Sequence, residues 1–238
     1  FNIKDLQSDR TIAPVTRGNP HKANASYIVG QDSDLLFHPY YYDTWWTGSD
    51  SLLVKTTDNG YSFEILYDFI DYLAALAIAP SNPDVIYAAT WPDWWVKKEI
   101  YRSTDGGNTF TLITPPEAML GNNFHIPYDI LVDHEDPMKI TVARTSMSNE
   151  YLNNNWLYQS TDGGNTWNNI SGSTFINESA TRINENLANP GGIYVSTRKG
   201  VWYKDDSMAD FEDISSDLPV STFSEVIVPY YRKSKIRN

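Results

Sequence analysis

The sequence predicts an all-β protein built from repeated antiparallel units, and three observations support this prediction. An eight-residue stretch occurs twice almost unchanged, at 103–110 and 160–167, and a weaker copy occurs at 56–63. Short runs of alternating apolar and polar residues lead into each copy. The copies recur at intervals of roughly 50 residues, and repeats of that length with several short strands each are typical of a β-propeller.

The repeated stretch has the chemistry of a tight turn between two strands. All three copies fit the pattern Ser/Thr-x-Asp-x-Gly-x-Thr/Ser-aromatic. The Asp side chain can accept hydrogen bonds from the backbone N–H groups that follow it, and Gly supplies the positive φ that a tight turn needs. The closing Thr or Ser begins the next strand, and the aromatic residue points into a core. The residues expected to hold these turns are Asp58, Gly60, Asp105, Gly107, Asp162 and Gly164.

This pattern resembles the Asp-box, or BNR repeat, of sialidases, sortilin-type receptors, xyloglucan-degrading endoglucanases and many secreted bacterial repeat proteins. In those families the Asp-box joins the two outer strands of a propeller blade and usually lies far from the active site. The resemblance therefore implies a β-propeller of a secreted or cell-surface protein. It implies much less about function, because the motif is a folding element.

Each unit is expected to contain four strands, with a Pro-containing turn between the first two and the Asp motif between the last two. Pro fits such a turn because it cannot donate to a strand ladder. In the first unit, the first two strands are expected at 11–15 and 27–29, and the fourth unit has a degenerate motif at 201–211. We expect four four-stranded blades and the start of a fifth, forming part of a larger propeller. Their expected bounds are about 8–68, 72–114, 126–171, 179–215 and, for the fifth, 222–238.

The expected ligand-binding face is the end of the blades that is opposite the Asp motifs. That end collects the loops between strands two and three and the loops between blades, and propellers generally bind ligands there. Aromatic residues and carboxylates gather in these loops, with a Trp pair in each of the first two units. The candidate ligand-binding residues are Tyr41, Tyr42, Asp43, Trp45, Trp46, Trp91, Asp93, Trp94, Trp95, His125, Glu150 and Tyr151.

Two interpretations of these aromatic residues remain open. They can pack against neighbouring blades or against another domain. Exposed Trp and Tyr can instead stack on sugar rings or anchor a protein ligand. The first hypothesis is therefore a non-catalytic binding or scaffold module of a larger secreted or cell-surface protein, with a polysaccharide or protein as its ligand. A structural spacer is an alternative.

A glycoside hydrolase of the xyloglucan-degrading type is the enzymatic alternative. Such an enzyme needs two carboxylates that face each other across a cleft. Asp43, Asp93, Asp129 and Glu150 fall near the expected face, but nothing in their spacing identifies a pair. Sialidase activity is not expected, because the Arg-Ile-Pro sequence that opens sialidases is absent. We therefore favour a protein without catalytic residues.

Charge and composition argue against several further classes. The net charge of −12 would repel a nucleic-acid backbone or an anionic membrane surface. There is no Cys, which excludes disulfides and Cys-ligated metals, and no run of about 18 apolar residues predicts a membrane span. No cofactor is expected. Ca²⁺ is the one metal considered, because acidic residues pair at 32–34 and 205–206, but no twelve-residue calcium loop accompanies them. The four His residues are scattered along the sequence.

Overall fold

The computed structural model describes residues 36–41, 43–49, 51–91, 99–115, 125–146, 156–173, 180–189, 191–197 and 200–215. The regular secondary structure within these ranges consists of β-strands. The same ranges contain no helix that is long and apolar enough to cross a membrane. The strands expected at 11–15 and 27–29 and the further blade expected at 222–238 lie outside the described residues.

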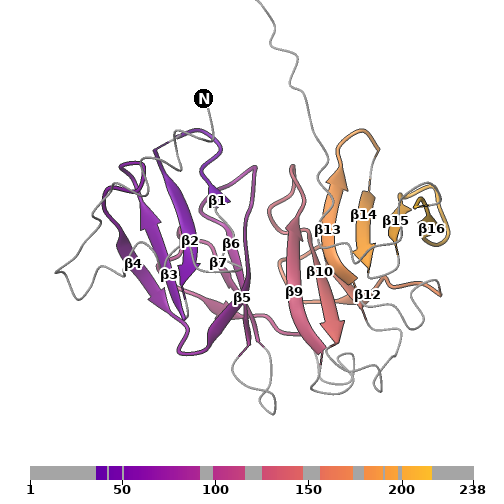
Figure 1. Cartoon of the computed structure of the whole chain (residues 1–238), viewed down its shortest axis with the longest axis horizontal. Coiled ribbons are helices and arrows are strands. Elements are labelled where there is room, and N and C mark those ends of the chain that lie inside the picture. Colours follow the sequence, from indigo (N-terminus) through magenta and orange to yellow (C-terminus); the bar gives the residue numbers. More distant parts are fainter. Residues whose placement is uncertain are drawn as a thin grey trace, which may run out of the picture.

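The strands form four antiparallel sheets of four strands each, and every sheet uses four consecutive strands (Figure 1). The first sheet contains β1 (Leu36–Phe37), β2 (Trp45–Ser49), β3 (Leu52–Thr56) and β4 (Glu64–Asp68). The second contains β5 (Tyr72–Ile78), β6 (Ile86–Trp91), β7 (Ile100–Ser103) and β8 (Thr111–Leu112). The third contains β9 (His125–Val132), β10 (Ile140–Ser146), β11 (Leu157–Ser160) and β12 (Asn168–Asn169). The fourth contains β13 (Ala180–Asn186), β14 (Gly192–Thr197), β15 (Val201–Lys204) and β16 (Glu212–Asp213).

This arrangement confirms the predicted fold class, which was an all-β chain of four-stranded propeller blades. Consecutive strands pair with each other, so each sheet is an up-and-down meander. The first strands of the last three sheets contact one another in succession, β5 against β9 and β9 against β13. Figure 1 shows the sheets following one another in chain order, as the blades of a partial propeller do.

The turns at 56–63, 103–110 and 160–167, here called the Asp turns, share one hydrogen-bond pattern. In the second of them, the Ser103 hydroxyl donates to Asp105 (2.7 Å) and accepts from the backbone N–H of Gly107 (2.9 Å). Asp105 also accepts from the backbone N–H and the hydroxyl of Thr109, at 2.9 and 2.6 Å. The other two turns repeat these bonds within 0.2 Å. Where the chain reverses between two strands, hydrogen bonds to the Asp side chain thus take the place of the hydrogen bonds of the strand ladder.

The final glycine of each of the last two Asp turns also determines how one sheet packs on the preceding sheet. A Cβ atom on Gly164 would lie 2.6 Å from the side chain of Ile113, and one on Gly107 would lie 2.8 Å from Leu53. Beside Gly164, the indole N–H of Trp167 donates to the Ile113 carbonyl at 2.9 Å. The Asp turns thus fix the edge of a sheet and dock it on its neighbour.

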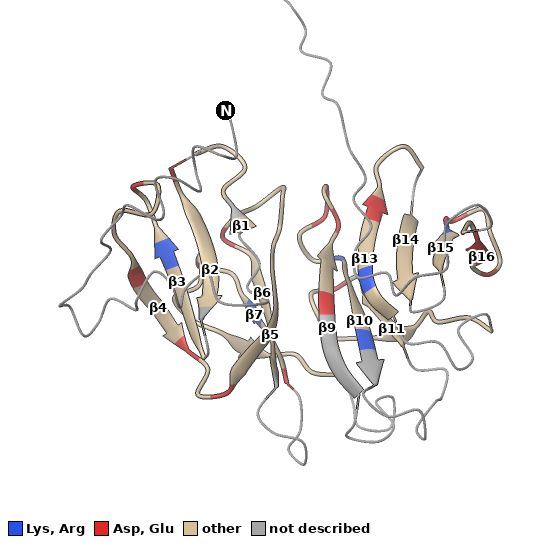
Figure 2. Cartoon of the chain, viewed as in Figure 1, with Lys and Arg blue, Asp and Glu red and all other residues tan. Residues whose placement is uncertain are grey.

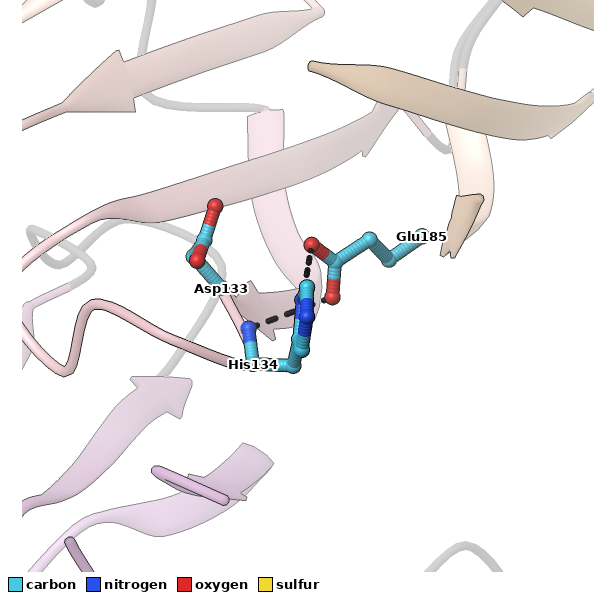
Figure 3. Close-up of side chains that lie close together, drawn as sticks. All are labelled: Asp133, His134 and Glu185. Atoms are coloured by element: carbon cyan, nitrogen blue, oxygen red, sulfur yellow. Dashed lines mark hydrogen bonds and ion pairs between the residues drawn. The ribbon is translucent and has the colours of Figure 1, made fainter. Parts of the chain in front are cut away.

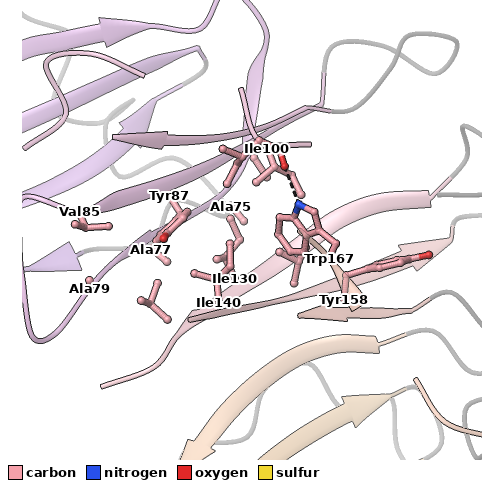
Figure 4. Close-up of a cluster of buried hydrophobic side chains, with 14 residues drawn as sticks. Ala75, Ala77, Ala79, Val85, Tyr87, Ile100, Ile130, Ile140, Tyr158 and Trp167 are labelled. Carbon is pink, nitrogen blue, oxygen red and sulfur yellow. Dashed lines mark hydrogen bonds between the residues drawn. The ribbon is translucent and has the colours of Figure 1, made fainter. Parts of the chain in front are cut away.

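The largest buried cluster lies between the second and third sheets. Figure 4 shows Ala75, Ala77 and Tyr87 of β5 and β6 facing Ile130, Ile140 and Trp167 of the third sheet. Small residues such as Ala75 and Ala77 alternate along β5, so the larger side chains of the neighbouring sheet can approach it closely. Similar clusters join the first sheet to the second and the third to the fourth.

The prediction for the first unit was wrong in its strand assignment. Residues 38–46 were expected as a loop between the second and third strands, but β2 begins at Trp45 and pairs with both β1 and β3. Trp45 and Trp46 are therefore core residues, with 1% and 2% of their surface exposed. The cause is that β2 is covered on both faces, so it lacks the alternation of apolar and polar residues that identifies a half-exposed strand.

Candidate functional site

Each sheet has two ends that differ in their connections. At one end, here called the Asp-turn end, the connection between the first two strands bonds to the Asp turn of the same sheet. The N–H of Asn59 donates to the carbonyl of Asp43 (2.8 Å), that of Gly106 to Asp84 (2.9 Å), and that of Gly163 to Met138 (2.8 Å). The opposite end, here called the loop end, carries the connections between strands two and three and between sheets. This agrees with the expected geometry of the blades.

Of the predicted ligand-binding residues that the structure describes, few lie at the expected face. Tyr41 and Asp43 are exposed, but they lie at the Asp-turn end, because residues 38–44 connect β1 to β2. The ring of Tyr41 lies 4.6 Å from that of His38, which in turn stacks on Trp46. The aromatic residues of the first and second units were predicted to lie together at the loop end. The structure instead places the connection that holds Tyr41 and Asp43 of the first unit at the Asp-turn end.

The remaining candidates fall at or beyond the limits of the described residues. Trp91 ends β6 and His125 begins β9, and both positions are at the loop end, as expected. Six candidates lie outside the described residues: Tyr42, Asp93, Trp94, Trp95, Glu150 and Tyr151. Their assignment to the ligand-binding face stays a prediction.

The described part of the loop end presents two apolar side chains that the sequence analysis missed. Ile70, in the connection from β4 to β5, is 89% exposed, and Tyr72, the first residue of β5, is 62% exposed. Asp68 fixes this connection, because it accepts hydrogen bonds from the hydroxyl of Ser51 (2.7 Å) and the backbone N–H of Ile70 (2.9 Å). Tyr72 lies opposite Trp91 in the strand ladder, beside the start of the predicted Trp-rich loop. We define Ile70 and Tyr72 as the apolar tip.

The backbone of the apolar tip is strained. Ile70 has φ = +70°, a left-handed conformation that a β-branched residue rarely adopts. Such strain costs about 1–3 kcal/mol and often occurs at functional sites. The sequence gives only a weak indication of this conformation. In the turn Asp68-Phe69-Ile70-Asp71, an Ile occupies a position where turns usually have Gly or Asn.

A group of interacting polar side chains lies at the Asp-turn end, where the third sheet meets the fourth (Figure 3). Nδ1 of His134 lies 2.8 Å from the Glu185 carboxylate, and the backbone N–H of His134 donates to the other oxygen of that carboxylate at 3.2 Å. Lys139 forms an ion pair of 2.9 Å with Asp133. Figure 2 shows acidic residues on the turn between β9 and β10 and at the end of β13, so the group lies in an acidic environment.

These contacts shift the pKa values of the group in a consistent way. The hydrogen bond to Glu185 raises the pKa of His134 above its usual value, although burial opposes the shift. Burial alone would raise the pKa of Asp133, but hydrogen bonds from Lys139 and two backbone N–H groups outweigh it and lower that pKa. Burial would also lower the pKa of Lys139, yet the bond to Asp133 raises it. The charged forms of these residues therefore stabilise one another.

A small cleft adjoins this group. Asp133, Lys139 and Glu185 line one side, and Thr141 and Gln159 contribute further polar groups. The enclosed volume is about 20 Å³, which leaves room for about one water-sized group. In the sequence, His134 is one of four scattered histidines. No local pattern identifies it, because its partner Glu185 lies on the next sheet.

The described carboxylates whose contacts are clearest act in the fold. Asp129, one of the candidates for a hydrolase, accepts the backbone N–H groups of Ile130 (3.0 Å) and Ile183 (2.8 Å) and so joins two sheets. Hydrogen bonds lower the pKa of six carboxyl groups, three of which hold the Asp turns: Asp58, Asp68, Asp105, Asp133, Asp162 and Asp205. Glycoside hydrolysis instead needs one carboxyl group with a raised pKa.

The chain is similar in structure to solved β-propeller proteins. It resembles the GH74 xyloglucanase from Xanthomonas campestris with a TM-score of 0.60 and 14% sequence identity, over 79% of this chain and 31% of that one. It resembles the extracellular domain of a one-component system of B. thetaiotaomicron with a TM-score of 0.55 and 13% identity, over 81% and 23% of the two chains. A chain of the nidogen/laminin complex matches with a TM-score of 0.53 and 14% identity, over 74% and 62%.

At these identities the likeness shows the β-propeller fold alone. The neighbours include both an enzyme and domains of other kinds, and one of them is described as an extracellular domain. The chain spans about a quarter to a third of the length of the GH74 enzymes that it matches. No protein-family model and no curated protein matches the sequence.

Proposed function

We propose that the chain is a non-catalytic binding module of a secreted or cell-surface protein, that its blades are Asp-box blades, and that it binds a protein through the loop end. The apolar tip is the observation that carries this proposal. Ile70 extends into solvent in a conformation that costs folding energy, and Tyr72 is exposed beside it. Exposed apolar and aromatic residues in a fixed geometry are typical anchors of protein interfaces.

A protein ligand fits the chemistry of the tip better than a polysaccharide does. Sugar rings stack on flat aromatic faces, and Ile70 has none. A branched aliphatic side chain fits an apolar pocket, and the net charge of −12 favours a partner with a basic surface around that pocket. The nidogen/laminin complex provides a precedent for a propeller neighbour in a protein complex.

The enzymatic alternative has one observation in its favour, the likeness of the fold to a xyloglucanase. Fold alone does not imply activity, because one fold carries many functions. Asp129, one of the carboxylates considered for hydrolysis, accepts backbone N–H groups of two sheets, which favours a structural role for it. Asp93 and Glu150 remain the carboxylates to replace if hydrolysis of xyloglucan is ever detected.

A displayed library of random peptides tests the proposal. The library is selected on the immobilised chain, and the affinities of the selected peptides are then measured for wild type, Tyr72→Ala and Tyr61→Ala by biolayer interferometry. Tyr61 is a matched control, because it is 64% exposed and lies in an Asp turn at the other end of the first sheet. We expect Tyr72→Ala to weaken binding by roughly 10-fold or more and Tyr61→Ala to leave it unchanged.

Two results would contradict the proposal. Selected peptides that bind all three proteins equally would place the interface elsewhere. Absence of any binding peptide, together with Tyr72-dependent binding on an array of polysaccharides, would make the ligand a glycan.

A further inference from the structure

We propose that Asp133, His134 and Glu185 form a binding site for a divalent transition-metal ion such as Zn²⁺, across the junction of the third and fourth sheets. This inference is independent of the proposed ligand of the loop end. The imidazole and the two carboxylates each offer a ligand atom, and these atoms lie within 4.8 Å of one another.

The ligand atoms are close to the spacing that an ion requires. Two ligand atoms of a tetrahedral Zn²⁺ site, each about 2.0–2.2 Å from the ion, lie roughly 3.3–3.6 Å apart. Nδ1 of His134 and Oε1 of Glu185 are 2.8 Å apart, so an ion that replaces the shared proton needs them to separate by roughly half an ångström or slightly more. The three ligand atoms lie within 4.8 Å of one another, so the Asp133 carboxylate must move closer to the other two groups. The backbone N–H of His134 already holds the second oxygen of Glu185, which orients the carboxylate.

The three side chains are partly exposed to solvent, although Oδ1 of Asp133 also accepts the backbone N–H groups of Glu135 and Asp136 at 3.0 Å. The side chains of Asp133 and Glu185 are 17% and 18% exposed, and that of His134 is 39% exposed. The cleft beside Asp133 and Glu185 has room for a water-sized group, which could complete the coordination of an ion. The ion would thus enter from solvent and keep a water ligand.

Lys139 acts as the internal competitor of the ion. Its ammonium lies 2.9 Å from Asp133 Oδ2 and neutralises part of the charge of the cluster. An ion that takes Asp133 as its third ligand must displace this contact. Removal of the lysine charge should therefore strengthen metal binding, whereas a site that exists only as an ion-pair network would gain no metal affinity from it.

The donor set selects the class of metal. An imidazole nitrogen together with two carboxylate oxygens suits Zn²⁺ and similar borderline ions, whereas Ca²⁺ takes six to eight oxygen ligands. The ligands come from the turn that follows β9 and from β13, so a bound ion would link two neighbouring sheets. It should therefore stabilise the folded chain increasingly as the Zn²⁺ concentration rises above the dissociation constant.

Titration calorimetry with Zn²⁺ on the whole chain tests the site. We expect saturable binding to wild type, weakened at least about tenfold in His134→Ala and in Glu185→Gln. Lys139→Met should bind about two- to fivefold more tightly, the equivalent of losing a competing surface ion pair. His38→Asn is the matched control, because it removes an imidazole from the first sheet, and it should bind as wild type does.

A weaker affinity for Zn²⁺ must be distinguished from a loss of folding, and Glu185→Gln allows this. Glu185→Gln keeps the shape of the side chain, and thermal unfolding without metal would verify that each variant is folded. A rise in melting temperature with Zn²⁺ in wild type but not in Glu185→Gln would support the site. Absence of saturable binding to wild type, equal binding by wild type and His134→Ala, or no gain in Lys139→Met would overturn it.

Discussion

Left-handed backbone conformations occur at both ends of the sheets, and the residues that adopt them differ. At the Asp-turn end, Gly60, Gly107 and Gly164 have φ between +92° and +97°, and Asn59 has φ = +63°. At the loop end, the connection from β12 to β13 has a glycine, Gly172 with φ = +64°, but the connection from β4 to β5 has Ile70 with φ = +70°. Gly adopts such angles without steric cost, whereas a β-branched residue is strained. The Asp-turn end is thus optimised for folding, and the loop end keeps a residue that folding alone would not favour.

The surroundings of these residues strengthen the contrast. Gly107 and Gly164 lie against side chains of the preceding sheet, where a Cβ atom would not fit. Ile70 is almost fully exposed and fills no space in the core. A side chain that strains its backbone and buries almost none of its own surface contributes little to stability, so its contribution is best sought in binding.

The largest expected loss of stability comes from adding a methyl group to Gly164, which lies against Ile113 of the preceding sheet. Gly164→Ala combines a strained φ of +93° with a contact of 2.6 Å to Ile113, so we expect a loss of about 3 kcal/mol in the free energy of unfolding. Gly106→Ala is the matched variant, because Gly106 has φ = +73° but its Cβ would meet nothing closer than 3.5 Å. It should lose only about 1 kcal/mol, from backbone strain. Urea denaturation measures both, and equal losses would mean that docking on the preceding sheet contributes nothing.

The next effect is a loss of stability in acid that originates at the Asp turns. Hydrogen bonds from Thr109 and Ser103 lower the pKa of Asp105 to about 2, and the equivalent bonds lower that of Asp162 to about 2. A carboxyl group whose pKa is lower in the folded state stabilises the protein above its unfolded pKa of about 4. That contribution should disappear as the pH falls from about 4 to about 2.

The double variant Asp105→Asn/Asp162→Asn isolates this contribution. It should be less stable than wild type at neutral pH, and the difference should shrink as the pH falls towards 2, because the two carboxyl groups of wild type then become protonated and lose their charge. Melting temperatures measured across this range provide the comparison. A difference that stays constant with pH would show that the charge of the Asp turns is irrelevant to stability.

The fold could be predicted from the sequence because its signals are local. Each Asp turn lies within eight residues and carries its own hydrogen-bond pattern, so three copies were enough to identify the blades. The first blade was assigned incorrectly because β2 is buried on both faces and reads as an aromatic loop. Trp45 and Trp46 illustrate the limit: aromatic residues are equally suited to a core and to a ligand surface, and composition does not separate the two.

The candidate sites could not be predicted in the same way. The partner of His134 is Glu185, 51 residues further along the chain, and only the packing of two sheets brings them together. Ile70 is identified by its backbone angle and its exposure, neither of which is encoded in a pattern of residue types. The prediction that the loop end binds a ligand rested on topology, and topology placed Trp91 and His125 correctly at that end.

The smallest expected effect concerns the stability of the two matched tyrosines. Tyr61 and Tyr72 are 64% and 62% exposed, so replacing either by Ala should change the free energy of unfolding by no more than about 0.5 kcal/mol. Thermal unfolding of both variants checks this. A large loss in Tyr72→Ala alone would mean that the apolar tip supports folding, and the contrast between the two ends would weaken.

The most direct test of the account is one substitution with two measurements, Ile70→Gly. Glycine relieves the left-handed strain and removes a side chain that is 89% exposed, so we expect the unfolding free energy to rise by about 0.5–1 kcal/mol. The same variant should bind the peptides selected on wild type roughly 10-fold or more weakly. A variant that is more stable and binds less would establish that Ile70 is kept for recognition. A variant that is less stable, or that binds as wild type does, would contradict the account.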